Sequence, residues 1–145
     1  MGRLEYEDWE QRWNQLYDKC YKKGYGSLSS DERMWFNVRG VIDAINNGGT
    51  ISYYYNHGAD DLDDTLEDLE KIDAIEMIDI LNKINELFPN GKPSTDIDER
   101  NEVISSWEDG QYDDLLEALN ERFYDKLEEE LEMKLDEVVK RLISN

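Results

Sequence analysis

The spacing of apolar residues along the chain predicts helices in most segments. A first helix is expected from about Leu4 to Lys22, because its apolar residues recur at helical spacing on one face: Trp9, Trp13, Leu16, Tyr17 and Cys20. Ser29, followed three residues later by Glu32, is typical of a capping box and predicts the start of a second helix. The apolar face of that helix consists of Trp35, Val38, Val41, Ile42 and Ile45.

A glycine-containing break, Asn46-Asn47-Gly48-Gly49, ends the second helix. Residues 51–55 are rich in Ile and Tyr, which suits a strand, but no second alternating segment exists to pair with them, so we expect a short helix. A further helix is expected to begin at Asp60 and to carry a narrow apolar stripe of Leu62, Leu66 and Leu69.

The second half of the chain predicts three more helices. Residues 75–88 are apolar around much of the helix circumference, which is typical of a central, buried helix. A loop with both prolines follows, and then a helix over residues 97–107. The last element is expected to be one long helix from about Tyr112 to Ile143, with a continuous stripe of Leu115, Leu119, Phe123, Leu127, Leu131, Leu135, Val138 and Leu142. The fold class is therefore all-α, with residues 1–145 in one compact domain whose N-terminal aromatic helix falls within residues 1–23.

Composition adds a strong constraint on partners. The 145 residues include 36 acids and 16 bases, for a net charge of −20. This excess argues against direct binding to nucleic acid or to an anionic membrane, since both need Lys and Arg. The single cysteine, the lack of a long apolar run and the polar start of the chain lead us to expect a cytoplasmic protein.

The negative charge is concentrated in two regions. Residues 1–50 carry a net charge of −1, residues 51–95 carry −8 and residues 96–137 carry −13. On the helix that begins at Asp60, acids are expected to cover the side opposite the leucines, with only Lys71 to balance them: Asp60, Asp61, Asp63, Asp64, Glu67, Asp68 and Glu70. These acids give roughly one carboxylate per 2 Å of helix axis, close to the roughly 1.7 Å per phosphate of duplex DNA. The candidate partner-binding surface consists of these seven acids together with Asp113, Asp114 and Glu117.

The sequence offers little for catalysis or metal binding. No acidic stretch has the glycine and glutamate spacing of an EF-hand, and one histidine with one cysteine cannot build a zinc site. His57, three residues before Asp60, is expected to cap a helix or lie in a polar loop. Cys20 lies on an apolar stripe, so we expect a buried structural thiol. Because neither a phosphate-binding loop nor a nucleophile elbow is present, we expect no catalytic residues, no cofactor, no metal and no enzymatic activity.

One stretch resembles a known family. Residues 46–58, Asn46 to Gly58, are similar to the signature "NNGG, two residues, Gln-Tyr-Phe, then Asn and Gly" of a bacterial domain-of-unknown-function family that includes a protein described as a DNA mimic. The signature residues are Asn47, Gly48, Gly49, Tyr53, Tyr54 and Asn56. The similarity covers about residues 28–143. Departures from the family pattern are Thr50 and Ser52 in place of Phe and Gln, Asp73 in place of Gly, and Asn120 in place of Asp.

The resemblance implies an all-helical fold and an acidic protein that occupies the DNA-binding surface of a transcription factor or nucleoid protein. The leading hypothesis is therefore a non-enzymatic DNA mimic that binds a basic DNA-binding protein. Two alternatives remain: an immunity protein that neutralises a toxin such as a nuclease, and an adaptor whose exposed aromatics form the interface. The long C-terminal stripe also leaves a homodimer open.

Overall fold

The computed structural model describes residues 6–144, and these residues form helices and turns with no strand. The helices are α1 (Tyr6–Lys23), η1 (Tyr25–Ser27), α2 (Ser30–Gly48), η2 (Thr50–Tyr55), η3 (His57–Asp61), α3 (Leu62–Lys71), α4 (Ile75–Asn85), η4 (Pro89–Gly91), α5 (Ile97–Ser106), α6 (Asp113–Arg122), the π-helical turn η5 (Phe123–Leu127) and α7 (Glu128–Ser144). The all-α prediction is confirmed, including the short helix after the glycine break. The predicted start of the first helix at Leu4 lies outside the described residues.

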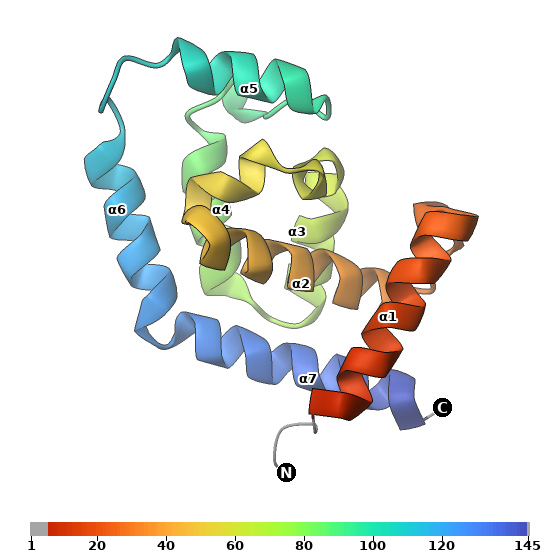
Figure 1. Ribbon diagram of the computed structural model, residues 1–145. Helices are drawn as coiled ribbons and strands as arrows, with labels where there is room; N and C mark the ends of the chain where they lie inside the picture. The colour runs from red at the N-terminus through yellow and green to blue at the C-terminus, as the bar shows by residue number, and fades with distance from the viewer. Residues whose placement is uncertain (1–5, 145) are drawn as a thin grey trace.

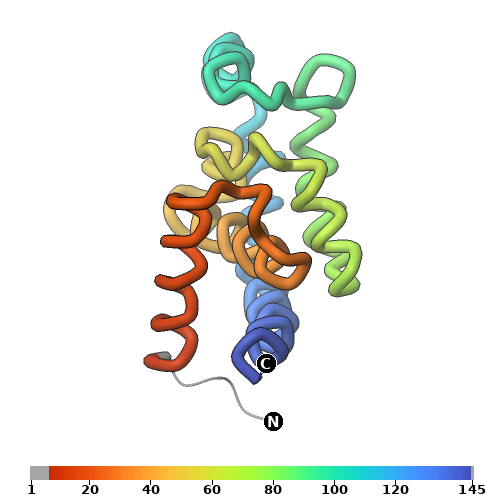
Figure 2. Tube along the Cα trace, turned by 90° about the vertical axis from the view of Figure 1, so that its right-hand side faces the viewer, coloured from red at the N-terminus to blue at the C-terminus, as the bar shows by residue number. Residues whose placement is uncertain are grey.

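Helices α2, α3 and α4 occupy the middle of the molecule, and α5, α6 and α7 run around them as an outer frame (Figure 1). α1 packs across one end of this arrangement, beside α2 and the C-terminal end of α7 (Figure 2). The core consists largely of apolar residues from α2, α4 and α7. α4 is the predicted central helix, with Met77, Ile80, Leu81 and Ile84 buried, although Ile75 at its start is 62% exposed.

Local sequence explains where several helices begin. The Ser29 side chain accepts a hydrogen bond from the backbone N–H of Glu32 at 3.2 Å, and the Glu32 carboxylate accepts one from the backbone N–H of Ser29 at 2.8 Å. The predicted capping box is therefore confirmed. Asp96 caps α5 in the same manner, since its side chain accepts from the N–H groups of Asp98 and Glu99.

The prediction of one continuous helix from Tyr112 to Ile143 is wrong. The chain turns within η5, where Asp125 has ψ 85° and Lys126 has φ 71°, and only α7 forms the long C-terminal helix. A straight helix over these 32 positions would be about 48 Å long, too long for both halves to follow a compact core. The turn keeps Phe123 and Leu127 buried and lets α6 contact η2 while α7 contacts α2.

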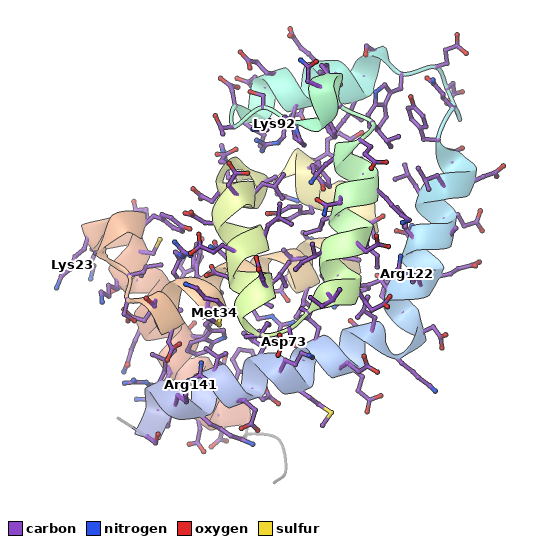
Figure 3. All side chains as sticks on the ribbon, turned by 180° about the vertical axis from the view of Figure 1, so that it is seen from behind. Lys23, Met34, Asp73, Lys92, Arg122 and Arg141 are labelled. Atoms are coloured by element: carbon purple, nitrogen blue, oxygen red, sulfur yellow. The ribbon has the colours of Figure 1, made fainter. Side chains whose placement is uncertain are left out.

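The turn between α3 and α4 explains one departure from the family pattern. Asp73 adopts a left-handed backbone with φ 56°, a conformation that glycine adopts without a steric cost. Lys134 on α7 donates hydrogen bonds from Nζ to the carbonyl oxygens of Ile72 at 3.1 Å and Asp73 at 3.0 Å. Figure 3 shows Asp73 at this turn, next to α7. The C-terminal helix thus holds the turn that precedes α4.

Candidate functional site

The glycine break at the end of α2 packs directly against α6. Gly49 has φ 86°, and a Cβ at this position would lie 2.9 Å from Nδ2 of Asn120. Oδ1 of Asn120 accepts two hydrogen bonds from Thr50, one from its backbone N–H and one from its hydroxyl, both at 2.7 Å. The chain therefore needs glycine here both for its backbone angle and for the close approach of the Asn120 amide. This contact fixes where α6 lies relative to α2.

The two signature tyrosines are buried and fully hydrogen-bonded. The Tyr53 hydroxyl donates to the carbonyl oxygen of Gly58 at 3.1 Å. The Tyr54 hydroxyl lies 2.6 Å from Oδ1 of Asn85 and 3.1 Å from the carbonyl oxygen of Leu81 on α4. These two tyrosines join η2 to η3 and α4, so their place in the signature is structural.

The other signature residues lie at the surface of the same turn. Asn47 and Gly48 are exposed, and a Cβ on Gly48 would lie 3.0 Å from Oγ of Ser52. Asn56 is also exposed, and its side chain donates to the carbonyl oxygen of Ser52 at 2.6 Å.

Arg100 on α5 is completely buried and holds the η2–η3 segment in place. Its guanidinium donates to the carbonyl oxygens of Tyr54 at 3.0 Å, Asn56 at 2.8 Å and Ser94 at 2.8 Å. It also donates to Oδ1 of Asp60 at 2.8 Å, so Asp60 is the counter-ion of a buried cation. Arg100 was not among the candidate residues predicted from the sequence.

The ionisation of Asp60 reflects these partners. Burial, the largest single effect, raises the pKa of the Asp60 carboxyl, but hydrogen bonds from His57 and Arg100 outweigh it and hold the pKa below its ordinary value of 3.8. Nδ1 of His57 lies 3.0 Å from Oδ2 of Asp60. Asp60 therefore contributes to the fold, and its charge is largely balanced within the chain.

Arg33 on α2 forms ion pairs with three more acids of α3. Its guanidinium lies 2.8 Å from Oδ1 of Asp68, 3.4 Å from Glu67 and 3.5 Å from Asp64. The expectation that only Lys71 balances the acids of this helix is wrong, because Arg33 and Arg100 were not recognised as their partners. Two basic residues distant in the sequence balance part of this negative charge.

Asp68 does not lie on the surface of α3. It is completely buried and accepts hydrogen bonds from Arg33 and from Nδ2 of Asn37 at 2.9 Å. The expected exposure of Asp68 is wrong because α3 buries Thr65 and Asp68 together with its leucines. The only sequence signal for this was Arg33 and Asn37, four residues apart on α2 and so on one helix face.

Three acids of the η3–α3 segment have no hydrogen-bond or ion-pair partner among residues 6–144: Asp61, Asp63 and Glu70. Burial, together with the carboxylates of Asp64 and Asp60, raises the pKa of Asp61. The Asp64 carboxylate accepts a hydrogen bond from the Tyr25 hydroxyl at 2.9 Å in addition to its contact with Arg33. The acidic surface of α3 is thus about half compensated.

The exposed acids without an ion-pair partner in the described chain are concentrated on the outer frame instead. We call the following residues of α5, α6, η5 and the start of α7 the acidic arc: Asp98, Glu102, Glu108, Asp109, Asp113, Asp114, Glu117, Glu121, Asp125, Glu129 and Glu130. The basic residues of this stretch leave most of these charges unbalanced. Arg100 is buried, Arg122 binds Glu76 and Asp79 on α4, and Lys126 is the third.

The arc contains Asp113, Asp114 and Glu117, but it does not join them to the acids of α3. Figure 3 shows α4 between α3 and α6, with Arg122 at the end of α6 that faces α4. The candidate surface predicted from the sequence is therefore divided into two regions. The remaining residues of the arc were expected only as part of the acidic stretch 96–137; their sequence signal was the shortage of nearby Lys and Arg.

The acids of α6 form a regular row. Asp113, Glu117 and Glu121 are spaced four residues apart, and Asp114 lies beside them, all exposed. Four carboxylates over about 12 Å of helix axis give roughly one charge per 4 Å, close to the roughly 3.4 Å per phosphate along one DNA strand. Like charges at these spacings destabilise a helix by a few tenths of a kcal/mol per pair. Asp113 and Asp114 lie in the first turn of α6, where acids favour the helix, but Glu117 and Glu121 lie beyond it and gain nothing from this effect.

The described residues contain no metal site, no activated thiol and no membrane-spanning helix. Within residues 6–144, no group of three or more His, Cys, Asp and Glu side chains is arranged to hold a metal ion. Cys20 is partly buried, and burial together with the charge of Asp61 raises the pKa of its thiol. In that same range, each helix is too short or too polar to cross a membrane.

Comparison with known proteins identifies a family for this chain. No curated protein and no solved structure matches the chain. The family model described as "DMP19-like protein" matches residues 26–142. This region begins shortly before α2 and includes the η2–η3 turn and the acidic arc, but it contains none of α1. The chain belongs to the DMP19-like protein family.

Proposed function

We propose that the protein is a non-enzymatic binding protein whose acidic arc occupies the DNA-binding surface of a basic protein, as duplex DNA would. One observation carries this proposal: eleven exposed acids lie along a continuous outer frame, and the only bases among them are a buried Arg100, a paired Arg122 and Lys126. A surface with such a charge distribution attracts basic partners and repels nucleic acid.

The internal pairing of the α3 acids supports the arc as the contact surface. Asp60, Asp64, Glu67 and Asp68 already interact with Arg33 or Arg100. A partner cation that bound these acids would compete with an existing partner, whereas one that bound the arc would not. The acids of α6 therefore offer the larger gain in binding free energy to an incoming Lys or Arg.

The shape of the arc also fits this function. The helices that carry these acids, α5, α6 and α7, follow one another in a curve around the molecule (Figure 1). A DNA-binding groove accepts a convex, negatively charged backbone, and the row on α6 has roughly the linear charge density of one DNA strand. Family membership is consistent with this proposal, since the matched region includes the whole arc.

Partner capture tests the proposal. The full chain is immobilised and exposed to native lysate, and bound proteins are eluted either with duplex DNA or with buffer of the same ionic strength. We expect basic DNA-binding proteins that are released by DNA and retained in the matched buffer. A partner that resists DNA would contradict the proposal and favour the toxin-neutralising or adaptor alternatives, and an empty column would also contradict it.

A further inference from the structure

A groove lies between α1, α2 and the η2–η3 segment, away from the acidic arc. Its volume is about 630 Å³. Its aromatic lining comes from Trp13, Tyr17, Tyr25, Phe36 and Tyr53. Residues of α1, α2 and the η2–η3 segment all contribute to its lining. Because the family match begins at residue 26, α1 adds one wall of this groove to the family domain.

The aromatic rings form a connected wall. The Trp13 ring centroid lies 6.1 Å from that of Phe36, with the planes 23° apart, and 6.5 Å from that of Tyr17. Tyr25 meets Phe36 edge to face at 6.1 Å. Tyr17 remains 59% exposed although it lines the groove. Such a surface can accept a cation against ring faces.

The groove also contains a carboxylate that no basic side chain of residues 6–144 contacts, although the more distant charge of Arg33 slightly offsets the rise that burial causes in its pKa. Asp61 lines it and has no hydrogen-bond or ion-pair partner among residues 6–144, whereas Asp43 is bound by Arg39 at 3.0 Å and Asp60 by Arg100 at 2.8 Å. The charge of Asp61 acts on groups of the same groove, since it contributes to the raised pKa values of Cys20, Tyr25 and Tyr53, after the larger effect of burial. Neither Lys nor Arg occurs among the described residues that line this groove.

We propose that this groove binds an arginine side chain of the basic partner, with the guanidinium paired to Asp61 and packed against the aromatic wall of Trp13, Tyr17 and Phe36. A guanidinium is planar and weakly hydrated, stacks on aromatic rings and binds a carboxylate through two N–H groups. Lysine offers a compact, strongly hydrated charge that suits this wall less well. The source of the arginine rests on the proposed function, but binding of the side chain itself does not depend on the arc.

A small probe tests this site on the full chain. N-acetylarginine amide is titrated while the indole N–H signals of the tryptophans are followed by NMR, and N-acetylcitrulline amide serves as the uncharged analogue of the same shape. We expect a saturable shift of the Trp13 signal with the arginine probe and none with the citrulline probe. Equal shifts with both probes, or no saturable shift, would overturn the proposal.

Two matched pairs of variants locate the contact. Asp61→Asn is expected to weaken binding of the arginine probe by about fivefold, and Asp63→Asn, which removes the same charge outside the groove, by less than about twofold. Tyr17→Ala is expected to weaken binding by about threefold, whereas Tyr21→Ala on the same helix, with Tyr21 86% exposed and outside the groove, leaves it unchanged. Equal effects of the two Asp variants would show that the probe responds only to net charge, and equal effects of the two Tyr variants would show a general effect on α1. Either result would overturn the proposed site.

A variant of the arc separates the two proposals. Neutralisation of Asp113, Asp114, Glu117 and Glu121 is expected to leave the affinity for the arginine probe within about twofold of the original chain, because α6 contributes no residue to the groove. Loss of probe binding in this variant would show that the arc, and not the groove, attracts the probe.

Discussion

Asn120 on α6 accepts both hydrogen bonds that Thr50 offers, from the backbone N–H and from the hydroxyl, each at 2.7 Å. Thr50 is completely buried, so neither group has water as a replacement partner. Through this one amide, the glycine turn after α2 determines where the acidic row of α6 lies. The glycine turn after α2 and the acidic row of α6 are therefore held together by this contact.

Asn120→Ala should destabilise the fold. The substitution leaves the N–H and hydroxyl of Thr50 unsatisfied, which costs about 1–3 kcal/mol of unfolding free energy. Asn120→Asp keeps an acceptor oxygen for both groups and should cost less than the alanine variant. Chemical denaturation measures both free energies. Equal losses for the two variants would show that the acceptor oxygen at position 120 does not account for the stabilising effect of Asn120.

Gly49→Ala should lower the unfolding free energy much more than replacement of a glycine with no neighbouring atoms. At φ 86° an alanine is strained, and its Cβ would meet the Asn120 amide. We expect a loss of about 1–3 kcal/mol in thermal or chemical unfolding. Gly26→Ala is the control, since nothing lies within 4 Å of its Cβ position and its φ is not in the left-handed region. Similar stabilities for the two variants would contradict the close packing of α6 against this turn.

Asp68→Ala should unfold the protein more readily than removal of an exposed acid of the same helix. The change leaves Asn37 without its buried acceptor and Arg33 without its shortest ion pair. We expect a loss of about 2–4 kcal/mol, whereas Glu70→Ala should change the unfolding free energy by less than about 0.5 kcal/mol. If both variants unfold at the same denaturant concentration, Asp68 is not the internal counter-ion described here.

Asp60 and Asp61 should respond to pH with opposite signs. The pKa of Asp60 is lowered on folding, so its charge stabilises the fold above the ordinary value of 3.8 and loses this effect as the pH falls through the lowered pKa. The pKa of Asp61 is raised, so its charge destabilises the fold at neutral pH, and this penalty disappears in acid. At neutral pH, Asp60→Asn should therefore lower and Asp61→Asn should raise the unfolding free energy.

Unfolding curves at neutral pH and in acid measure these effects. Both differences from the original chain should shrink in acid, where the carboxyls are protonated in either state. A loss of stability for Asp61→Asn at neutral pH would contradict the environment assigned to this carboxylate.

The helices and the capping box were predictable because they depend on local sequence. Ser29 with Glu32 gives the start of α2 directly. The turn at Asp125 and Lys126 was not predictable, since neither glycine nor proline occurs there and the apolar spacing continues without interruption. It results from packing of α6 and α7 against different parts of the core.

The candidate surface likewise has one part that local sequence predicts and another that only the fold reveals. Exposure of Asp113, Asp114 and Glu117 agrees with their sequence context, which contains few bases. The ion pairs of Asp60, Glu67 and Asp68 depend on Arg33 and Arg100, which lie 34 or more positions from the acids they bind. Charge density along the chain therefore indicates an acidic protein, but only the fold distinguishes paired acids from unpaired ones.

The salt dependence of partner binding tests the role of the acidic arc most directly. Two variants with the same change in net charge are compared with the original chain. The arc variant carries Asp113→Asn, Asp114→Asn, Glu117→Gln and Glu121→Gln. The control carries Asp63→Asn, Glu70→Gln, Asp73→Asn and Glu86→Gln, which are exposed acids of the α3–α4 region without ion-pair partners in residues 6–144.

The measurement is the affinity for a captured basic partner over a range of salt concentrations, with circular dichroism to show that each variant is folded. The arc variant should bind at least about tenfold more weakly at low salt and lose much of the salt dependence, while the control retains both. Equal affinities and slopes for the two variants, or a larger loss in the control, would contradict the assignment of the partner contact to the arc.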